Sequence, residues 1–235
     1  MKSTLIITTR NEIEGVTTLF PRLPLSAFDE VLAIDLNSTD GTLDFYKKNN
    51  IRVIPQITPG RGNAIRLAAA NATGDVMVFF APDGNENPDD LLKLRDLIIA
   101  GNDMVIASRF LPGARNEEDV SWYRPRAWAN KAFTLSVKLF WGGTITDTIN
   151  GYRSIRKDKL LELNTDEPGF AIEFQMSIRS RKLKFKVVEI PTVEGDRIGG
   201  HSNAYTLPTG WRVLRTLLKE IWLGQRFVID RLQPR

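Results

Sequence analysis

The sequence has no cysteine and a single histidine, His201. Without cysteine the chain can form neither a disulfide nor a thiolate metal site, and one histidine is too few for the usual zinc ligand sets. Any metal ion bound here must be a hard cation held by oxygen atoms. Carboxylates, amides and arginines are therefore the groups to examine for chemistry.

Long apolar runs are also absent. No uninterrupted apolar stretch approaches the roughly 20 residues that a helix needs to cross a bilayer. The first residues, MKSTLIITTRNE, become polar after a few apolar positions, which is sooner than in a secretory signal peptide. We expect a cytoplasmic protein.

Before residue 211, basic and acidic residues nearly balance. The formal net charge is +4, and residues 211–235 hold six basic and two acidic side chains, so residues 1–210 are about neutral. A nucleic-acid-binding protein would spread basic charge over one face of its fold. We therefore expect no nucleic-acid partner and a local role for the basic C-terminal segment.

The first 110 residues alternate short apolar runs with helix-like segments. Five runs are predicted strands: residues 3–8, 30–35, 51–56, 75–81 and 103–110. Near-continuous apolar strands separated by helices indicate an α/β protein whose mainly parallel sheet is covered by helices on both faces. Sheets of this kind bind ligands outside the carboxyl ends of their strands. The polar residues that follow the strands are therefore the candidate site residues.

The rest of the chain predicts a helix over about 126–140, an amphipathic helix around 170–183 and a strand over 184–191. No internal repeat or low-complexity linker interrupts it, so we predict one domain over residues 1–210 and a helical tail over 211–235. One interpretation of the tail is core packing or a homodimer contact. The other is an in-plane helix on an anionic membrane surface. Its apolar residues at helical spacing are Trp211, Leu214, Leu217, Leu218, Ile221 and Trp222.

Asp35 ends the second predicted strand, in the segment DLNSTDGT. A carboxylate at this edge can accept the imino N–H of a uracil or guanine ring. Alternatively, Asp35 caps the helix that follows, as acidic residues commonly do in such turns.

Glycines flank Arg61 in PGRGNA, residues 59–64, just before a predicted helix. Such a loop can approach a diphosphate closely, with backbone N–H groups and one cation facing it. Arg61 is therefore a candidate ligand for a diphosphate.

Asp83 and Asn85 follow the fourth predicted strand, in FFAPDGNENP. They lie two residues apart and offer oxygens from one loop at the same sheet edge as Asp35. A divalent cation that bridges a nucleotide diphosphate takes few protein oxygens, because phosphate and water supply the rest. One carboxylate and one amide can therefore hold it.

The ordered set of motifs resembles the family-2 glycosyltransferases, most closely the dolichol-phosphate mannose synthase-like group, which has the GT-A fold. The resemblance covers residues 4 to about 205. The matching segments are TTRNE (8–12), DLNSTDGT (35–42), GRGNA (60–64), ATGDVMVFFAPDGNENP (72–88), ASRF (107–110), DTINGYR (147–153) and EIPTVEGDRIGGHSN (189–203).

The resemblance implies a GT-A enzyme that transfers a hexose, with inversion, from a nucleoside diphosphate sugar (GDP-mannose or UDP-hexose) to polyprenyl phosphate. It assigns Asp83 and Asn85 to an Mg²⁺ or Mn²⁺ ion, and Asp83, Arg109 and Arg197 to catalysis. The residues assigned to donor binding are Thr9, Glu12, Asp35, Arg61, Asp83, Arg197 and Ser202. Those assigned to the acceptor phosphate are Arg109, Arg124, Arg126 and Arg153. An enzyme with a lipid acceptor would be peripheral on the cytoplasmic face of the membrane.

Four positions depart from the family pattern: Arg10, Leu36, Ala81 and Asn203. Ala81 stands where the family has the first Asp of Asp-x-Asp, so one usual metal-site carboxylate is missing. Two alternatives therefore stay open. One is a glycosyltransferase of polysaccharide or glycoconjugate assembly with a soluble glycan acceptor. The other is a non-catalytic nucleotide-sugar-binding protein.

Overall fold

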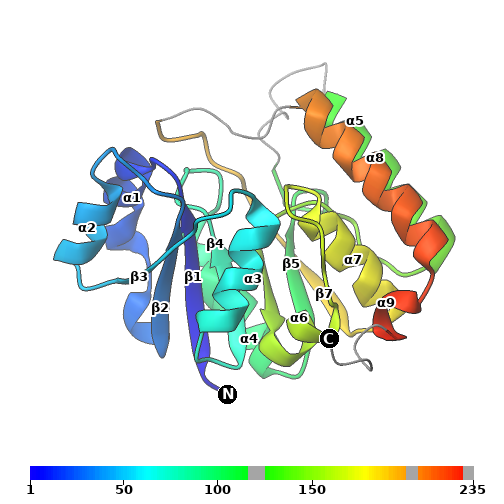
Figure 1. Cartoon of the computed structure of the whole chain (residues 1–235), viewed down its shortest axis with the longest axis horizontal. Coiled ribbons are helices and arrows are strands. Elements are labelled where there is room, and N and C mark those ends of the chain that lie inside the picture. Colours follow the sequence, from blue (N-terminus) through cyan, green and yellow to red (C-terminus); the bar gives the residue numbers. More distant parts are fainter. Residues whose placement is uncertain (116–124, 200–205, 230–235) are drawn as a thin grey trace.

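The computed structural model describes residues 1–115, 125–199 and 206–229. At its centre lies a seven-stranded sheet in the order β3-β2-β1-β4-β6-β5-β7 (Figure 1). Strand β6 runs antiparallel to β4 and β5, and the other paired strands run parallel. The predicted mainly parallel α/β sheet is thus confirmed. The strands are β1 (Ser3–Thr9), β2 (Glu30–Asp35), β3 (Arg52–Pro55), β4 (Val76–Phe80), β5 (Met104–Ser108), β6 (Arg153–Arg156) and β7 (Val187–Pro191).

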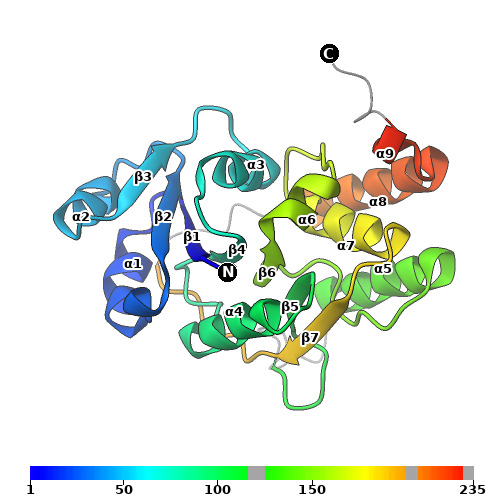
Figure 2. The ribbon, with the colours of Figure 1, turned by 90° about the horizontal axis from the view of Figure 1, so that it is seen from below.

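Helices cover both faces of the sheet, with α3 and α6 on one side and α1 and α4 on the other (Figure 2). The first four connections follow the predicted alternation of strand and helix, because each apolar run ends in polar turn residues before a helix begins. The helices are α1 (Ile13–Leu19), α2 (Thr42–Lys48), α3 (Arg61–Asn71), α4 (Leu91–Ile99), α5 (Pro125–Trp141), α6 (Lys157–Glu162), α7 (Ile172–Lys182), α8 (Thr206–Leu223) and α9 (Arg226–Ile229).

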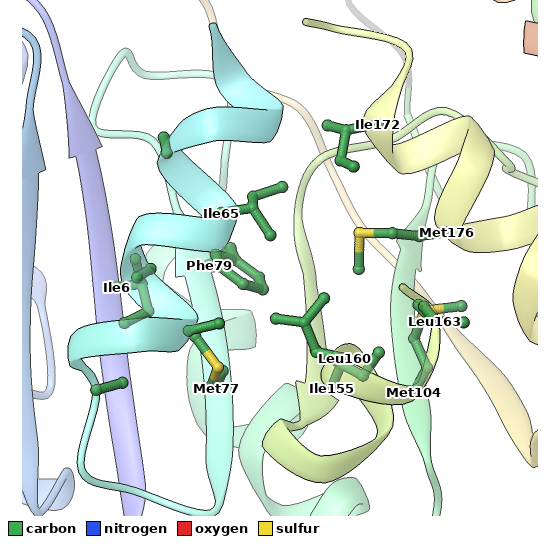
Figure 3. Packing of buried hydrophobic residues seen from close by; sticks show 14 of the residues in the cluster. Ile6, Ile65, Met77, Phe79, Met104, Ile155, Leu160, Leu163, Ile172 and Met176 are labelled. Carbon is green, nitrogen blue, oxygen red and sulfur yellow. The ribbon is translucent and has the colours of Figure 1, made fainter. Parts of the chain in front are cut away.

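Successive strand residues point to opposite faces of the sheet, so the central strands contribute side chains to two hydrophobic cores. On one face, Ile6, Met77 and Phe79 pack against α3, α6 and α7 (Figure 3). On the other face, Leu5, Val78 and their neighbours pack against α1, α2 and α4. Burial on both faces explains why the strands are apolar at nearly every position.

A third core joins α5, α7 and α8 beside the sheet. Val213 and Leu217 of α8 pack with Val137 of α5 and with Phe174 and Ile178 of α7. Helix α8 begins at residue 206, before the predicted boundary at 210, and its inner face belongs to this core. The division into a domain over 1–210 and a tail over 211–235 stays a prediction, but α8 packs as part of the body.

A buried ion network holds α8 in place. The fully buried carboxylate of Glu220 accepts from Arg179 Nε at 2.9 Å and from Lys182 Nζ at 2.6 Å, and also from Gln175 Nε2 at 2.9 Å. A buried charge is tolerated only when it is paired and hydrogen-bonded, as here. The core-packing interpretation thus describes the inner face of α8.

Candidate active site

A cleft of about 1320 Å³ opens at the carboxyl edge of the sheet. The register of β1, β2 and β3 brings Thr9 beside Asp35, and Asp35 beside Pro55, so the polar segments after these strands meet there. The lining comes from the ends of β1 and β2, the segment after β3, the loops after β4, β5 and β7, helices α3, α5 and α8, and residues 149 and 166–170. Predicted residues that line the cleft are Thr9, Glu12, Arg61, Asp83, Asn85, Arg109 and Arg197.

Asp35 lies at the predicted edge but is almost fully buried. Its carboxylate accepts from the Ser38 N–H at 2.8 Å, from the Ser38 hydroxyl at 2.6 Å and from the Thr9 hydroxyl at 2.8 Å. These bonds shape the loop after β2, whose Leu36 lines the cleft together with Arg10. Asp35 does not cap α2 (Thr42–Lys48), because the Thr42 N–H donates to Asp40 Oδ1 at 3.0 Å instead. Its role in base binding stays a prediction.

Arg61 opens α3 and forms an ion pair with Glu173 near the start of α7. Although burial lowers it, the carboxylates of Glu173 and Glu86 raise the pKa of Arg61 above its ordinary value. The side chain keeps some exposure to the cleft. Glu173 and Gln175 lie two residues apart on α7, and the sequence alone does not show which of them faces the cleft. The structure places Glu173 on Arg61, whereas Gln175 bonds to Asp166 and Glu220.

Arg197 links the loop after β4 to the loop after β7. Its Nη1 donates to Asp83 Oδ2 at 2.9 Å, and its Nη2 donates to Glu12 Oε1 at 2.8 Å. The backbones of the two loops also pair, since the Ile198 N–H donates to the Asp83 carbonyl at 2.7 Å. Three segments that are distant in sequence thus converge on the guanidinium of Arg197.

Acidic charge accumulates around Asp83. Burial raises the pKa of Glu12 to about 7, and the charge of Asp83 adds to this while Arg197 opposes it. Burial likewise raises the pKa of Glu86 to about 8, opposed by Arg61 and reinforced by Asp83. Carboxylates whose ionisation is suppressed by burial and by a nearby carboxylate mark a place where a cation would be stabilised.

The oxygen atoms that the cleft offers suit a hard divalent cation that takes most of its ligands from phosphate and water. In the described part of the chain, no group of three or more acidic or histidine side chains could hold a metal ion. Asp83 and Asn85 nevertheless line the same cleft and offer a carboxylate and an amide oxygen, both of which suit Mg²⁺ or Mn²⁺. Ala81 accounts for the missing third group.

Arg109 lines the cleft but has a partner already. Its Nε donates to Asp147 Oδ2 at 2.7 Å and its Nη2 to Asp147 Oδ1 at 3.0 Å, a bidentate pair. Asp147 comes from the segment DTINGYR and is fully buried. The Nη1 of Arg109 lies 3.5 Å from Glu194 Oε1. Arg109 is therefore held rigidly, with its fork directed at a structural carboxylate.

The predicted acceptor arginines do not all gather in the cleft. Arg153 is fully buried in β6, and its guanidinium donates to the carbonyls of Asn150 and Glu173 and to the Ser177 hydroxyl. These internal bonds leave it unsuited to hold an acceptor, so we no longer place it there. Arg124 and Ser202 lie outside the described residues, and the structure places only the backbone of Arg126, at the start of α5.

Helix α8 contributes residues to the cleft that the sequence did not assign to it. Arg212, Arg215 and Lys219 line the cleft together with Val213 and Thr216. Their spacing of three and four residues shows in the sequence that they share a helix face. It does not show which face turns toward the cleft, because packing against α5 and α7 decides that.

The sheet order, with a cleft at the carboxyl edge, is that of the GT-A class of transferases. The sequence matches the model of glycosyl transferase family 2 over residues 4–163, and the chain belongs to this family. It is therefore a glycosyltransferase, as the motifs predict.

Several named glycosyltransferases are similar along most of this chain. The undecaprenyl-phosphate mannosyltransferase of Micrococcus luteus is 29% identical over 86% of this chain and 87% of its own length. The glycosyltransferase AglJ of Haloferax volcanii is 28% identical over 82% of this chain, and the dolichol-phosphate mannosyltransferase of Pyrococcus furiosus is 29% identical over 99%. This chain spans only 62% and 66% of the lengths of those two proteins.

Solved structures share the fold. Glucosyl-3-phosphoglycerate synthase from Mycobacterium tuberculosis, crystallised with Mn²⁺, UDP and phosphoglyceric acid, superposes with a TM-score of 0.73. The alignment covers 93% of this chain and 78% of that one, at 20% sequence identity. This likeness establishes the GT-A fold.

Proposed function

We propose that this glycosyltransferase moves a hexose, with inversion, from a nucleoside diphosphate sugar to polyprenyl phosphate. The observation that carries the proposal is the convergence of Asp83, Asn85, Arg61 and Arg197 on one cleft at the carboxyl edge of the sheet. Oxygen donors for a cation and guanidinium groups for a diphosphate are the two requirements of such a donor. The names of the relatives from Micrococcus luteus and Pyrococcus furiosus support the lipid phosphate acceptor.

Each charged group has a role in this reaction. An Mg²⁺ or Mn²⁺ ion held by Asp83 and Asn85 would neutralise charge on the departing diphosphate. Arg61 and Arg197 bind the diphosphate oxygens and stabilise the charge that develops as the sugar leaves. The phosphate nucleophile is ionised at neutral pH and needs little help from a base. Catalysis then rests on positioning, and the ion pair of Arg109 with Asp147 fixes one wall of the cleft.

We also propose that the enzyme is cytoplasmic and docks on the cytoplasmic face of anionic membranes. None of the described helices is long and apolar enough to cross a membrane. Large apolar side chains nevertheless stand exposed on adjacent helices α5 and α8, which contact each other. We name these nine residues the apolar face: Trp128, Leu135, Leu139 and Phe140 of α5, with Trp211, Leu214, Leu218, Ile221 and Trp222 of α8. Exposed apolar surface of this extent marks an interaction site.

The deciding assay combines GDP-mannose and UDP-hexoses with undecaprenyl or dolichyl phosphate, in the presence of Mg²⁺ or Mn²⁺. Asp83→Ala should abolish turnover, because it removes the only carboxylate of the proposed metal pair. Asp89→Ala, at an exposed carboxylate of the same loop region, is the matched control and should stay active. Unchanged turnover in Asp83→Ala would refute the metal role.

Other outcomes identify the alternatives. Transfer to a glycan but to no lipid phosphate would identify a soluble-acceptor glycosyltransferase. Calorimetry that detects nucleotide-sugar binding indifferent to Mn²⁺, without turnover on any acceptor, would identify a binding protein.

A further inference from the structure

Helix α8 has three distinct faces. One face is buried against α5 and α7 and carries Val213, Leu217 and Glu220. The second carries Trp211, Leu214 and Leu218 of the apolar face. The third carries Arg212, Arg215 and Lys219, at helical spacing of three and four residues, and lines the cleft. The basic face therefore lies between the cleft and the apolar face.

The three basic side chains of this face differ in their hydrogen bonds and ion pairs. Lys219 forms an ion pair with Asp166, and Thr216 donates to Glu167 Oε2 at 3.3 Å. The Arg212 guanidinium lies against the backbone of Gly169, where an added Cβ would come within 2.9 Å of Nη1. Neither Arg212 nor Arg215 forms a hydrogen bond or an ion pair with any described residue.

We infer that Arg212 and Arg215 form an anion subsite that takes the phosphate group of the acceptor. Two guanidinium groups one helical turn apart present several N–H donors to the same point, which suits phosphate oxygens. The donor diphosphate has its own cations, Arg61 and Arg197, at the strand ends. The inference rests on the proposed function, since it assigns the acceptor of that reaction to α8.

The neighbouring apolar face favours an acceptor with a phosphate head and an apolar chain. Such a molecule can place its phosphate on Arg212 and Arg215 while its chain follows Trp211, Leu214 and Leu218 on the same helix. A soluble sugar phosphate would use only the arginines. The site should therefore favour a phosphate that carries an apolar chain over a soluble sugar phosphate.

The test is calorimetry of the full chain with a short-chain isoprenyl monophosphate, without vesicles or detergent. Three ligands are compared: this phosphate, the corresponding alcohol and inorganic phosphate. We expect the isoprenyl phosphate to bind, and Arg212→Gln and Arg215→Gln each to weaken it by about tenfold, the loss expected for one charged hydrogen-bonding partner. Arg226→Gln removes a charge from α9, outside the cleft lining, and should change affinity less than twofold.

A kinetic arm separates acceptor from donor. The KM for the lipid phosphate should rise in both glutamine variants, while the KM for the nucleotide sugar stays within twofold. An equal rise in both KM values, or wild-type affinity in the variants, would overturn the inference. If inorganic phosphate binds as tightly as the isoprenyl phosphate, the subsite recognises free phosphate and the lipid-acceptor form of the inference is wrong.

Failure of the proposed function gives a different result. If no lipid phosphate is glycosylated but arginine-dependent binding of isoprenyl phosphate persists, the subsite stands and the transfer reaction is wrong. If transfer occurs and is insensitive to both arginines, the function stands and the subsite is wrong.

Discussion

At the residue scale, Arg197 already contacts Asp83, the carboxylate that we propose as a metal ligand. It donates to Asp83 and Glu12, and its buried Nε–H has no hydrogen-bond partner among the described residues. A divalent cation held by Asp83 would compete with Arg197 for the charge of this carboxylate. Held by Glu12 on its other side, Arg197 would then direct free N–H donors at the diphosphate.

This exchange predicts opposite effects on metal and donor binding. Arg197→Met should tighten Mn²⁺ binding about threefold to tenfold without nucleotide, because it removes a competing charged contact worth ~1 kcal/mol. It should weaken nucleotide-sugar binding. Electron paramagnetic resonance of free Mn²⁺ measures the first effect, and calorimetry the second. Arg52→Met, which breaks an ion pair with Glu30 outside the cleft lining, controls for net charge. Weaker Mn²⁺ binding in Arg197→Met would contradict the exchange.

Asp147 makes the fold sensitive to acid. Although burial raises it, the Arg109 guanidinium and nearby backbone N–H groups hold the pKa of Asp147 below its ordinary 3.8. A carboxylate with a lowered folded-state pKa contributes stability above its unfolded-state pKa and loses it as the pH falls through the folded value. The contribution of the Asp147 pair is therefore full at neutral pH and declines below about pH 4.

The corresponding variant is Asp147→Asn. It should lower the free energy of unfolding at neutral pH by about 3 kcal/mol, because the largely buried Arg109 would keep only its longer contact with Glu194. It should also flatten the loss of stability on acidification. Urea unfolding at neutral pH and near pH 3, for both proteins, measures this. A variant that loses stability as steeply as wild type on acidification would show that other groups control the response.

At the scale of elements, two loops form one structure over the cleft. Gly84, in the loop after β4, has φ +100°, and an added Cβ would lie 2.4 Å from the Asp196 carbonyl oxygen and 2.8 Å from the Ile198 nitrogen. Only glycine allows the loop that carries Arg197 to dock on the loop that carries Asp83. The pairing of these loops therefore depends on the absence of a side chain.

Gly84→Ala should separate the loops and weaken nucleotide-sugar binding at least about tenfold, since Arg197 would lose its position. Gly101→Ala is the matched control, because Gly101 has φ +96° and no atom within 4 Å of an added Cβ. Both variants should lose ~1 kcal/mol of stability from backbone strain. Calorimetry with UDP or GDP and Mn²⁺ should separate them. Equal affinities in the two variants would mean that loop docking does not govern donor binding.

At the scale of the whole molecule, the apolar face predicts how the enzyme meets its acceptor. Trp211 is 67% exposed and Trp222 is 75% exposed, and both lie on a helix whose other two faces are the core and the cleft. Docking this face on a membrane would bring the mouth of the cleft to the lipid surface. Removing α8 to test this would also remove Val213 and Leu217 from the third core, so point variants are preferable.

We expect the full chain to co-sediment with vesicles of anionic lipid at low salt. Each basic residue near the lipid surface contributes about 1 kcal/mol to membrane binding. Salt screens this attraction, so less protein should co-sediment at high salt. Trp211→Ser combined with Trp222→Ser should lose most of this binding. Ile99→Ser, at an exposed apolar residue at the end of α4, should retain it. Retained binding in the tryptophan variant would exclude the apolar face. A wild-type dimer in ultracentrifugation that the same variant dissociates would identify a homodimer interface.

The sequence by itself determined the sheet and the candidate donor residues. Apolar runs of strand length, each ended by polar turn residues, dictate strands buried on both faces, and parallel strands bring their carboxyl ends to one edge. Asp83, Asn85 and Arg61 could therefore be placed near one another from local pattern alone. Ala81 showed equally directly that one expected carboxylate was missing.

Tertiary structure decided which charges are available and which face of each helix is used. An arginine looks the same in the sequence whether it is buried, as Arg153 is, or lines the cleft without a hydrogen-bond partner in the described part of the chain, as Arg212 does. Only the carbonyls and carboxylates brought close by packing distinguish the two. The sequence periodicity likewise showed that the basic residues of α8 share one face and its apolar residues another. The burial of Glu220 against Arg179 and Lys182 decided which of these faces turns toward the body of the protein. Contacts between residues far apart in the sequence set these outcomes, so no local pattern could contain them.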